Sequence, residues 1–334
     1  MKLKIFTFVT GLLIALCAQA QTSGTTGPLT WNYDPGIKTL SITGTGDMPD
    51  YSYDTQPWKA IKAEIQNVTI GDGVNKIGQS AFTGCMALQN ITISSSVTTI
   101  GNYAFMQCDA LQSITIPATV STLGDDVFTH CRSLQSIMIP ASVTTIGNSC
   151  FYGCRSLTSI AVDESNPAYK SIAGVLFTKD GTKLIQYPIE KPETEYTIPE
   201  GVKTIEESAF AMTRILNKIT IPTSVNNIGD YAFVACKMLS EVIVSWETPL
   251  AINPNIFRDV PLSTATLKVP AGKVADYQAA PVWKDFGTIT DGIAVTNIAG
   301  ADLRRSCQTC RLGGGESTCP PRLMKSPAVR LFYI

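Results

Sequence analysis

The chain lacks most of the residue patterns on which enzymes rely. It contains a single histidine, His130, and charged residues make up only 16% of its 334 residues. No P-loop, no GxGxxG after a strand and no HExxH sequence is present. The formal net charge of −1 excludes a generally basic surface of the kind that binds nucleic acid. We therefore predict that the protein is not an enzyme and has no cofactor, metal ion or nucleic-acid partner.

Long apolar runs are equally scarce, and the clearest lies at the N-terminus. Residues 5–16 are apolar, follow a short basic region and precede a small-x-small sequence at 18–20. This arrangement is typical of a secretory signal, and the run is too short to span a bilayer. We interpret residues 1–20 as a cleaved signal peptide and predict an extracellular or cell-surface protein without a transmembrane segment. Lipid attachment at Cys17 is less favoured, because Leu16 stands where a small residue is expected.

The dominant feature that is present is a sequence repeat with a constant period of 23. The unit is roughly Leu-x-x-Ile-x-Ile-Pro-x-x-Val-x-x-Ile-Gly-x-x-Ala-Phe-x-x-Cys, and a weaker pair, Phe210 and Phe233, closes the array. A fixed period of this length indicates stacked units, none of which can bury its apolar side alone. The residues that mark the period are Phe82, Phe105, Phe128, Phe151, Cys85, Cys108, Cys131 and Cys154.

Each unit begins with the pattern of a strand that buries one face. In the unit that starts at Leu111, Ile114 and Ile116 are expected to point inward, whereas Ser113 and Thr115 alternate with them and point outward. A proline follows and ends the strand, because it cannot donate a hydrogen bond to a ladder.

The second half of each unit is expected to turn back toward the next strand. In the same unit Val120 and Leu123 face inward, and Gly124 permits the turn that follows. Residues 125–128 suit a single helical turn in which Phe128 faces inward. The sequence therefore predicts a β-rich solenoid with a parallel sheet on one face and short helical turns or loops on the other.

The interval widens between Phe151 and Phe210 to more than twice the period. Asp180-Gly181 lies in this segment between two short apolar runs, a pattern that indicates a β-hairpin. We interpret the region near 163–198 as a hairpin insertion that projects from the coil.

The chain ends are expected to differ from the repeats. An open solenoid exposes apolar core and unpaired strand edge, so caps are needed. Residues 301–334 hold six Lys and Arg against two Asp and Glu, a composition unlike that of the body. The predicted segments after the signal are an N-terminal β cap over 21–66, repeats over 67–245, a last repeat and cap over 246–290, and a basic, cysteine-containing, disordered tail over 291–334.

The unit Ile-Pro-x-x-Val-x-x-Ile-Gly-x-x-Ala-Phe-x-x-Cys resembles the bacterial BspA-type leucine-rich repeat. Residues 44–49 and 269–272 are similar to that family's flanking segments, so the resemblance covers about residues 29–290. It implies a leucine-rich-repeat solenoid with N- and C-terminal caps. It also implies a surface or secreted protein, since some members act as adhesins for host matrix proteins or other microbes. The family has no common catalytic residues to carry over.

The cysteine series has two possible interpretations. Equivalent residues of stacked coils lie about 4.8 Å apart, within the Cα range of a disulfide. Parallel side chains keep their Cβ atoms near that separation, however, beyond the usual ~3.8 Å. We favour a ladder of buried free thiols over disulfides or a metal site, because Thr213 occupies one of the slots without a thiol.

His130 is the one candidate on which a catalytic site could be built. It precedes a ladder cysteine, in a slot that Gly84, Gln107, Gly153 and Ala235 fill in other units. No nucleophile elbow lies nearby in sequence. We therefore predict an ordinary histidine at the edge of a coil.

The outward strand positions form the candidate binding face. They are mostly small, neutral and hydroxylated, and they lack the depth of a small-molecule pocket. We predict contact with an extracellular protein, such as a host matrix protein, or with other cells. Glycan binding is the alternative, and a bare solvent face is also compatible with the pattern. The candidate residues are Asn90, Thr92, Ser113, Thr115, Ser136, Met138, Lys218 and Thr220.

Overall fold

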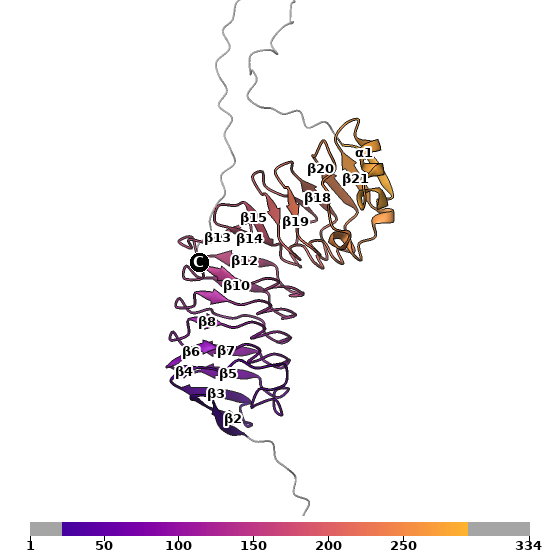
Figure 1. Cartoon of the computed structure of the whole chain (residues 1–334). Coiled ribbons are helices and arrows are strands. Elements are labelled where there is room, and N and C mark those ends of the chain that lie inside the picture. Colours follow the sequence, from indigo (N-terminus) through magenta and orange to yellow (C-terminus); the bar gives the residue numbers. More distant parts are fainter. Residues whose placement is uncertain (1–21, 293–334) are drawn as a thin grey trace, which may run out of the picture. The chain divides into compact units, whose positions relative to one another are not determined.

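The computed structural model describes residues 22–292, which form a solenoid built largely of short parallel strands (Figure 1). The predicted signal peptide (1–20) lies outside the described residues, as does the predicted tail (291–334) except for its first two residues. Each repeat forms one coil with three sides: a longer strand, a short strand and a turn. Hydrogen bonds run along the solenoid from each coil to the next. The predicted β-rich solenoid is confirmed.

The longer strands form the first side of the coils. Their register keeps equivalent residues opposite each other, so that Asn67 pairs with Asn90 and Ser136 with Ser159. In the N-terminal part an antiparallel hairpin continues into parallel strands. The strands of this side are β1 (Ser23–Thr26), β2 (Leu29–Asp34), β3 (Thr39–Gly44), β5 (Asn67–Ile70) and β7 (Asn90–Ile93) in one sheet, and β10 (Ser136–Ile139) and β12 (Ser159–Val162) in another.

The short strands form the second side, a sheet that the sequence did not predict. Leu123 was assigned to an inward corner and is indeed buried, but its backbone also pairs with Ile100 in the preceding coil. The strands of this sheet are β4 (Gly46–Asp47), β6 (Val74–Ile77), β8 (Thr99–Ile100), β9 (Thr122–Leu123) and β11 (Thr145–Ile146).

The C-terminal coils have the same two strand-bearing sides. Their first side consists of β16 (Glu195–Thr197), β18 (Lys218–Ile221), β20 (Glu241–Val244), β21 (Thr266–Val269) and β22 (Thr288–Asp291). Their second side consists of β13 (Tyr169–Ile172), β14 (Val175–Thr178), β15 (Lys183–Gln186), β17 (Thr204–Ile205) and β19 (Asn227–Ile228).

The third side consists of turns, in agreement with the predicted short helical turns or loops, and these turns have a hydrogen-bond ladder of their own. Ser80 and Gly84 have φ angles of 54° and 75°, in the left-handed region, and the pattern recurs in later coils. The N–H groups of Ser80 and Phe82 donate to the carbonyl groups of Asn102 and Ala104 in the next coil, at 2.9 Å and 2.8 Å. We call each set of such bonds between two coils a rung. Because the slot of Gly84 is one of the two left-handed positions in each coil, it accepts glycine readily.

The glycine of the Ile-Gly pair permits close packing rather than the predicted turn. Gly124 has no positive φ. A Cβ atom added there would lie 2.6 Å from the backbone nitrogen of Asn102 in the preceding coil. At Gly229 the added Cβ would lie 2.5 Å from the backbone nitrogen of Glu207. The repeat needs glycine here because the preceding coil occupies the space.

Aromatic rings stack along the interior of the third side. Phe128 is fully buried and its ring centroid lies 5.8 Å from those of Phe105 and Phe151. A second stack begins at Tyr187, whose ring lies 5.0 Å from that of Phe210. Tyr187 precedes Phe210 by one full period and therefore takes the phenylalanine slot of its own coil.

The strand predicted in the unit that starts at Leu111 does not form. The alternation of exposure is retained, since Ile114 and Ile116 are 8% and 6% exposed while Ser113 and Thr115 are exposed. The backbone here joins no sheet, and the first side is divided between β7 and β10. Apolar spacing predicted which side chains are buried, but it does not report whether two backbones come close enough to pair.

The hairpin does not project from the coil, contrary to the prediction. Val175, Leu176 and Phe177 of β14 are fully buried. Leu176 belongs to the core of the N-terminal coils, whereas Val175 and Phe177 belong to the core of the C-terminal coils. Strand β14 thus contributes to both cores. A continuous apolar run is what a strand buried on two faces requires.

Aromatic residues cover both ends of the described solenoid. Trp58 stacks on Phe82, with ring centroids 5.8 Å apart, and its indole N–H donates to the carbonyl oxygen of Ala81 at 2.9 Å. At the other end, the ring of Trp283 lies 5.9 Å from that of Phe257. The helices are η1 (Pro254–Phe257), η2 (Leu262–Thr264), α1 (Val274–Ala279) and η3 (Trp283–Asp285).

Candidate functional site

The predicted binding residues of the N-terminal coils lie exposed on the first side. Thr92 pairs with Thr69 in the ladder. The amide of Asn90 donates to the side-chain oxygen of Asn67 at 3.0 Å, so part of this polar face is bonded along the solenoid. Met138 is 55% exposed and is the main apolar point of the face. The exposed candidates are Asn90, Thr92, Ser113, Thr115, Ser136 and Met138.

The other two candidates, Lys218 and Thr220, lie on a different sheet and are only partly exposed. The ammonium group of Lys218 lies 3.0 Å from the carboxylate of Glu195 and 3.7 Å from that of Glu241. The hydrogen bond to Glu195 raises the pKa of Lys218. Lys268 lies 2.8 Å from the other oxygen of Glu241. The predicted face is therefore two surfaces, one neutral and one with a row of paired charges.

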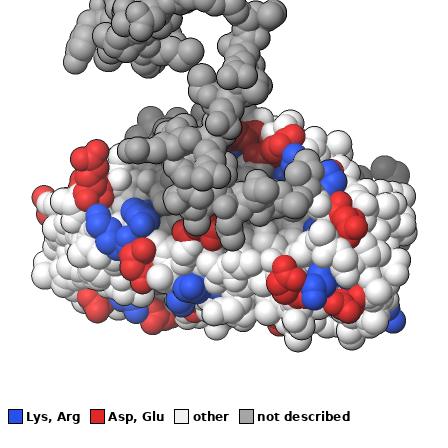
Figure 2. Space-filling model, turned by 90° about the horizontal axis from the view of Figure 1, so that it is seen from above, with Lys and Arg blue, Asp and Glu red and all other residues white. Residues whose placement is uncertain are grey.

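Charges on the face drawn in Figure 2 also occur in mixed groups. Acidic and basic side chains lie next to each other, with wide uncharged areas between them. The visible part of this face thus carries no broad patch of a single sign. Contacts with this face would depend on shape and hydrogen bonds more than on long-range attraction.

His130 lies on the third side at a left-handed position, with a φ angle of 60°. Burial lowers its pKa, and the nearby Arg132 and Arg155 lower it further. Its Nδ1 atom has no hydrogen-bond partner within residues 22–292. The ring packs against Gly153, where an added Cβ would lie 2.2 Å from Nδ1. These contacts hold a neutral imidazole against the next coil and do not orient it toward a nucleophile.

The ladder cysteines are buried and free. Burial raises the pKa of Cys131 to about 12 and that of Cys236 to about 11, so both remain protonated at neutral pH. Across residues 22–292, no group of three or more His, Cys, Asp or Glu side chains is placed to hold a metal ion. The same residues include no helix with the length and apolarity needed to cross a bilayer. The free cysteines are Cys85, Cys108, Cys131, Cys150, Cys154 and Cys236.

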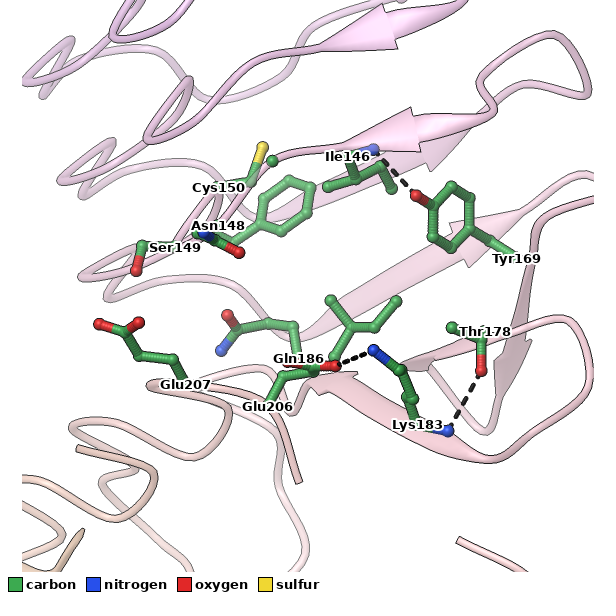
Figure 3. Close-up of a pocket in the computed structure, with 13 residues that line it drawn as sticks. Ile146, Asn148, Ser149, Cys150, Tyr169, Thr178, Lys183, Gln186, Glu206 and Glu207 are labelled. Carbon is green, nitrogen blue, oxygen red and sulfur yellow. Dashed lines mark hydrogen bonds and ion pairs between the residues drawn. The ribbon is translucent and has the colours of Figure 1, made fainter. Parts of the chain in front are cut away.

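A cavity that the sequence did not reveal lies where the hairpin joins the array (Figure 3). Its volume is about 250 Å³. One wall comes from the end of the N-terminal coils and includes Asn148 and Ser149; the facing wall includes Gln186 and Glu207. Lys183 lies at the rim, with its ammonium group 2.9 Å from the carboxylate of Glu206.

A second cavity of about 550 Å³ adjoins the first, since Ser149 and Glu207 line both. Its lining is mixed, with tyrosine rings beside acidic side chains. Together the two cavities are called the interruption cleft. Its second part is lined by Asp126, Ser149, Tyr152, Glu207, Ser208, Met212, Tyr231, Val234, Ala235, Arg258 and Asp259.

The interruption cleft exists because one coil contributes no turn to the stack of turns that forms the third side. Phe151 and Tyr187 are separated by more than one and a half periods, whereas Tyr187 and Phe210 keep the regular interval. After β12 the chain continues into the hairpin strands β13 and β14 and forms no turn on the third side. Glu206 occupies the slot that is glycine at Gly229, which is possible because no third side lies directly before it. The irregular interval and this glutamate were the sequence signals that could have located the cleft.

Comparison with known proteins agrees with this architecture. The model of the family described as the BspA type leucine-rich repeat region matches residues 60–178 and 191–277, in 6 copies. No curated protein matches the chain.

Two solved structures illustrate the structural similarity. A leucine-rich repeat protein from Eubacterium ventriosum is 26% identical, with a TM-score of 0.58 over 75% of this chain and 78% of that one. A leucine rich cell surface protein from Faecalibacterium prausnitzii is 22% identical, with a TM-score of 0.50 over 83% of this chain and 96% of that one. Both likenesses concern the stacked fold, and the second, at its lower identity, concerns the fold alone.

Proposed function

Because the chain belongs to the BspA-type leucine-rich repeat proteins, we propose that it is a secreted or cell-surface protein that mediates macromolecular interaction or adhesion. Its partner on this proposal is an extracellular protein, such as a host matrix protein, or the surface of another cell. The family's repeat scaffold is typically non-enzymatic and serves protein interaction. To this general role the proposal adds a location, outside the cell or on its surface, and a class of partner, an extracellular protein or the surface of another cell.

One observation carries the proposal: the neutral first side of the N-terminal coils. Six candidate residues from Asn90 to Met138 are exposed there on neighbouring coils, and none of them is charged. A face of this kind suits weak contacts summed over several repeats. No aromatic side chain is among the six, which favours protein over stacked sugar rings.

The location rests on separate support. The N-terminal segment has the composition of a secretory signal. The similar protein from Faecalibacterium prausnitzii is described as a cell surface protein. Surface-associated members are typical of the family, and we extend that location to this chain.

Replacing Thr92, Thr115 and Met138 together by Lys tests the face. We expect this variant to lose binding to immobilised matrix proteins or whole cells, with an unchanged melting temperature. A control variant with the same added charge replaces the exposed Thr98, Thr144 and Asn226 by Lys and should bind as the parent does. If the two variants bound equally well, the contact with the partner would lie outside the first side of the N-terminal coils.

The alternative function is that of a surface glycan-binding accessory protein. A glycan array probed with the same variants distinguishes the protein-binding function from the glycan-binding one. If the protein bound selected oligosaccharides but no matrix protein, the glycan-binding function would be favoured. The protein should also release no product from glycan or peptide substrates. Turnover that His130→Ala abolishes would contradict the non-enzymatic part of the proposal.

A further inference from the structure

The wall of the interruption cleft formed by the N-terminal coils carries backbone donors without partners. In complete rungs the N–H groups of three alternate residues donate to the next coil, as Phe128 does to Cys150 at 2.9 Å. The equivalent N–H groups of Ser149, Phe151 and Gly153 have no hydrogen-bond partner among residues 22–292. An unpaired row of backbone donors is a template for another chain, as at an open strand edge.

The coil of Phe210 carries the carbonyl groups that correspond to the acceptors of a complete rung, and Glu207 of this coil lines the facing wall. Three carbonyl groups of this coil, at Glu207, Ala209 and Ala211, correspond to those that accept in complete rungs. That of Ala209 is taken by the N–H of Tyr187 at 2.8 Å and by the amide of Gln186 at 3.2 Å. Those of Glu207 and Ala211 accept no hydrogen bond from the described residues. Of these unpaired groups, the donors of Ser149 and Phe151 and the acceptor of Glu207 belong to residues that line the cleft.

The charge of the cleft is acidic. Its carboxylates come from Asp126, Glu206, Glu207 and Asp259, against two cations. Lys183 pairs with Glu206 at 2.9 Å, and the guanidinium of Arg258 lies 3.9 Å from Asp259. Asp126 and Glu207 form no ion pair with the described residues, which leaves a surplus of two negative charges. Burial raises the pKa of Asp126, as expected for a carboxyl group that lacks a cationic partner.

We propose that the interruption cleft binds an extended polypeptide segment of a partner protein, which supplies the missing rung. The carbonyl groups of that segment accept from Ser149 and Phe151, and an N–H group of the segment donates to the carbonyl group of Glu207. A lysine or arginine of the segment pairs with the free carboxylates. A peptide backbone alternates donors and acceptors along its length, as these walls require. The inference rests on the proposed function as an interaction protein and assigns it a second site.

Two pools of fluorescein-labelled octapeptides test the inference. Each pool is random except at the fourth position, which is Lys in one and Glu in the other, and binding is measured by fluorescence anisotropy. We expect the Lys pool to bind at least tenfold more tightly than the Glu pool. Absence of binding by both pools, or equal binding, would overturn the proposal.

Variants of the cleft make the test specific. Glu207→Lys should remove the preference for the Lys pool, and Asn148→Trp should weaken both pools by at least tenfold through occlusion. The matched control is Asp230→Lys, because Asp230 is exposed and lies one period after Glu207, where the stack is complete. It should leave both affinities unchanged. Equal effects of Glu207→Lys and Asp230→Lys would show a general charge effect and contradict the site.

Amide hydrogen exchange reports on the backbone contact itself. Exchange in the segment 147–154 should slow on addition of the Lys pool, whereas exchange in the equivalent segment 101–108 should not change. Peptide binding without protection of 147–154 would exclude the rung. Partner binding that survives Glu207→Lys and Asn148→Trp would refute this site alone. A protein that binds the peptides but no matrix protein or cell would instead refute the proposed function.

Discussion

The thiol of Cys131 donates a hydrogen bond to the carbonyl oxygen of Phe105 in the preceding coil, at 3.1 Å. The same bond joins Cys154 to Phe128, also at 3.1 Å. These cysteines therefore do more than fill space, since Cys108, Cys131, Cys154 and Cys236 each also bond to a backbone carbonyl group of the coil before. Thr213 occupies the same slot, but its hydroxyl donates to the sulfur of Cys236 in the following coil, at 3.1 Å.

This arrangement predicts that the ladder thiols are unreactive until the protein unfolds. Cys85, Cys108, Cys131 and Cys154 are fully buried, and burial raises the pKa of each. Because the thiolate is the reactive form, both effects suppress modification. Titration with a thiol reagent at pH 8 should find these thiols after denaturation and largely not before. Recovery of fewer than two of the four in denatured, unreduced protein would favour disulfides instead.

A second prediction concerns stability at alkaline pH. Burial raises the pKa of Cys131 from 9.0 to about 12. The folded state thus holds the thiol proton more tightly than the unfolded chain does. The thiol's contribution to stability is complete below about pH 9 and is lost as the pH rises to about 12. Between these values each such thiol lowers the free energy of unfolding by up to about 1.4 kcal/mol per pH unit.

Urea denaturation at pH 8, 9 and 10 measures this loss. The parent and Cys131→Thr should both lose stability as the pH rises, but the variant should lose less, because it has one buried thiol fewer. The tyrosines whose pKa is raised are common to both proteins and cancel in the comparison. Identical pH slopes for the two proteins would argue against an isolated buried thiol at this position.

The repeat made the burial pattern predictable, whereas backbone pairing was less so. The constant interval located Phe128 and Cys131 in the core, because period and polarity together determine which side chains face inward. It did not reveal that residues 111–116 join no sheet or that the third side has its own ladder. Those features depend on distances and φ angles that residue types specify only weakly, since Tyr103 and Asp126 adopt positive φ as readily as glycine does in this turn.

The interruption cleft was not predicted because it results from a missing element. Two apolar runs around Asp180-Gly181 indicated a hairpin, but not that β14 would be buried in two cores. Because a hairpin replaces a turn, no turn of the third side lies between Phe151 and Tyr187, which fills the phenylalanine slot one period before Phe210. In the sequence, the irregular interval after Phe151 and the comparison of Glu206 with the glycine at 229 in the next unit carried this information.

A third prediction tests the assignment of inside and outside. Phe128 is fully buried between two phenylalanine rings, so Phe128→Ala should lower the free energy of unfolding by about 3–5 kcal/mol. Ser113 is exposed on the first side, and Ser113→Ala should change it by no more than ~0.5 kcal/mol. Equal urea midpoints for the two variants would contradict the assignment.

The last prediction compares Gly229 with Glu206, which occupy the same slot in neighbouring units. A Cβ at Gly229 would lie 2.5 Å from the backbone nitrogen of Glu207, and a backbone atom in a packed stack moves only at a cost. Gly229→Ala should therefore destabilise the protein by about 1–3 kcal/mol, as overpacking does. Glu206→Ala keeps a Cβ that is already accommodated and loses only the partly exposed ion pair to Lys183, so it should cost less than about 1 kcal/mol. Urea denaturation of both variants measures the difference. If Glu206→Ala proved as costly as Gly229→Ala, the coil before Glu206 would have to be packed as tightly as the others, and the interruption of the stack would not exist.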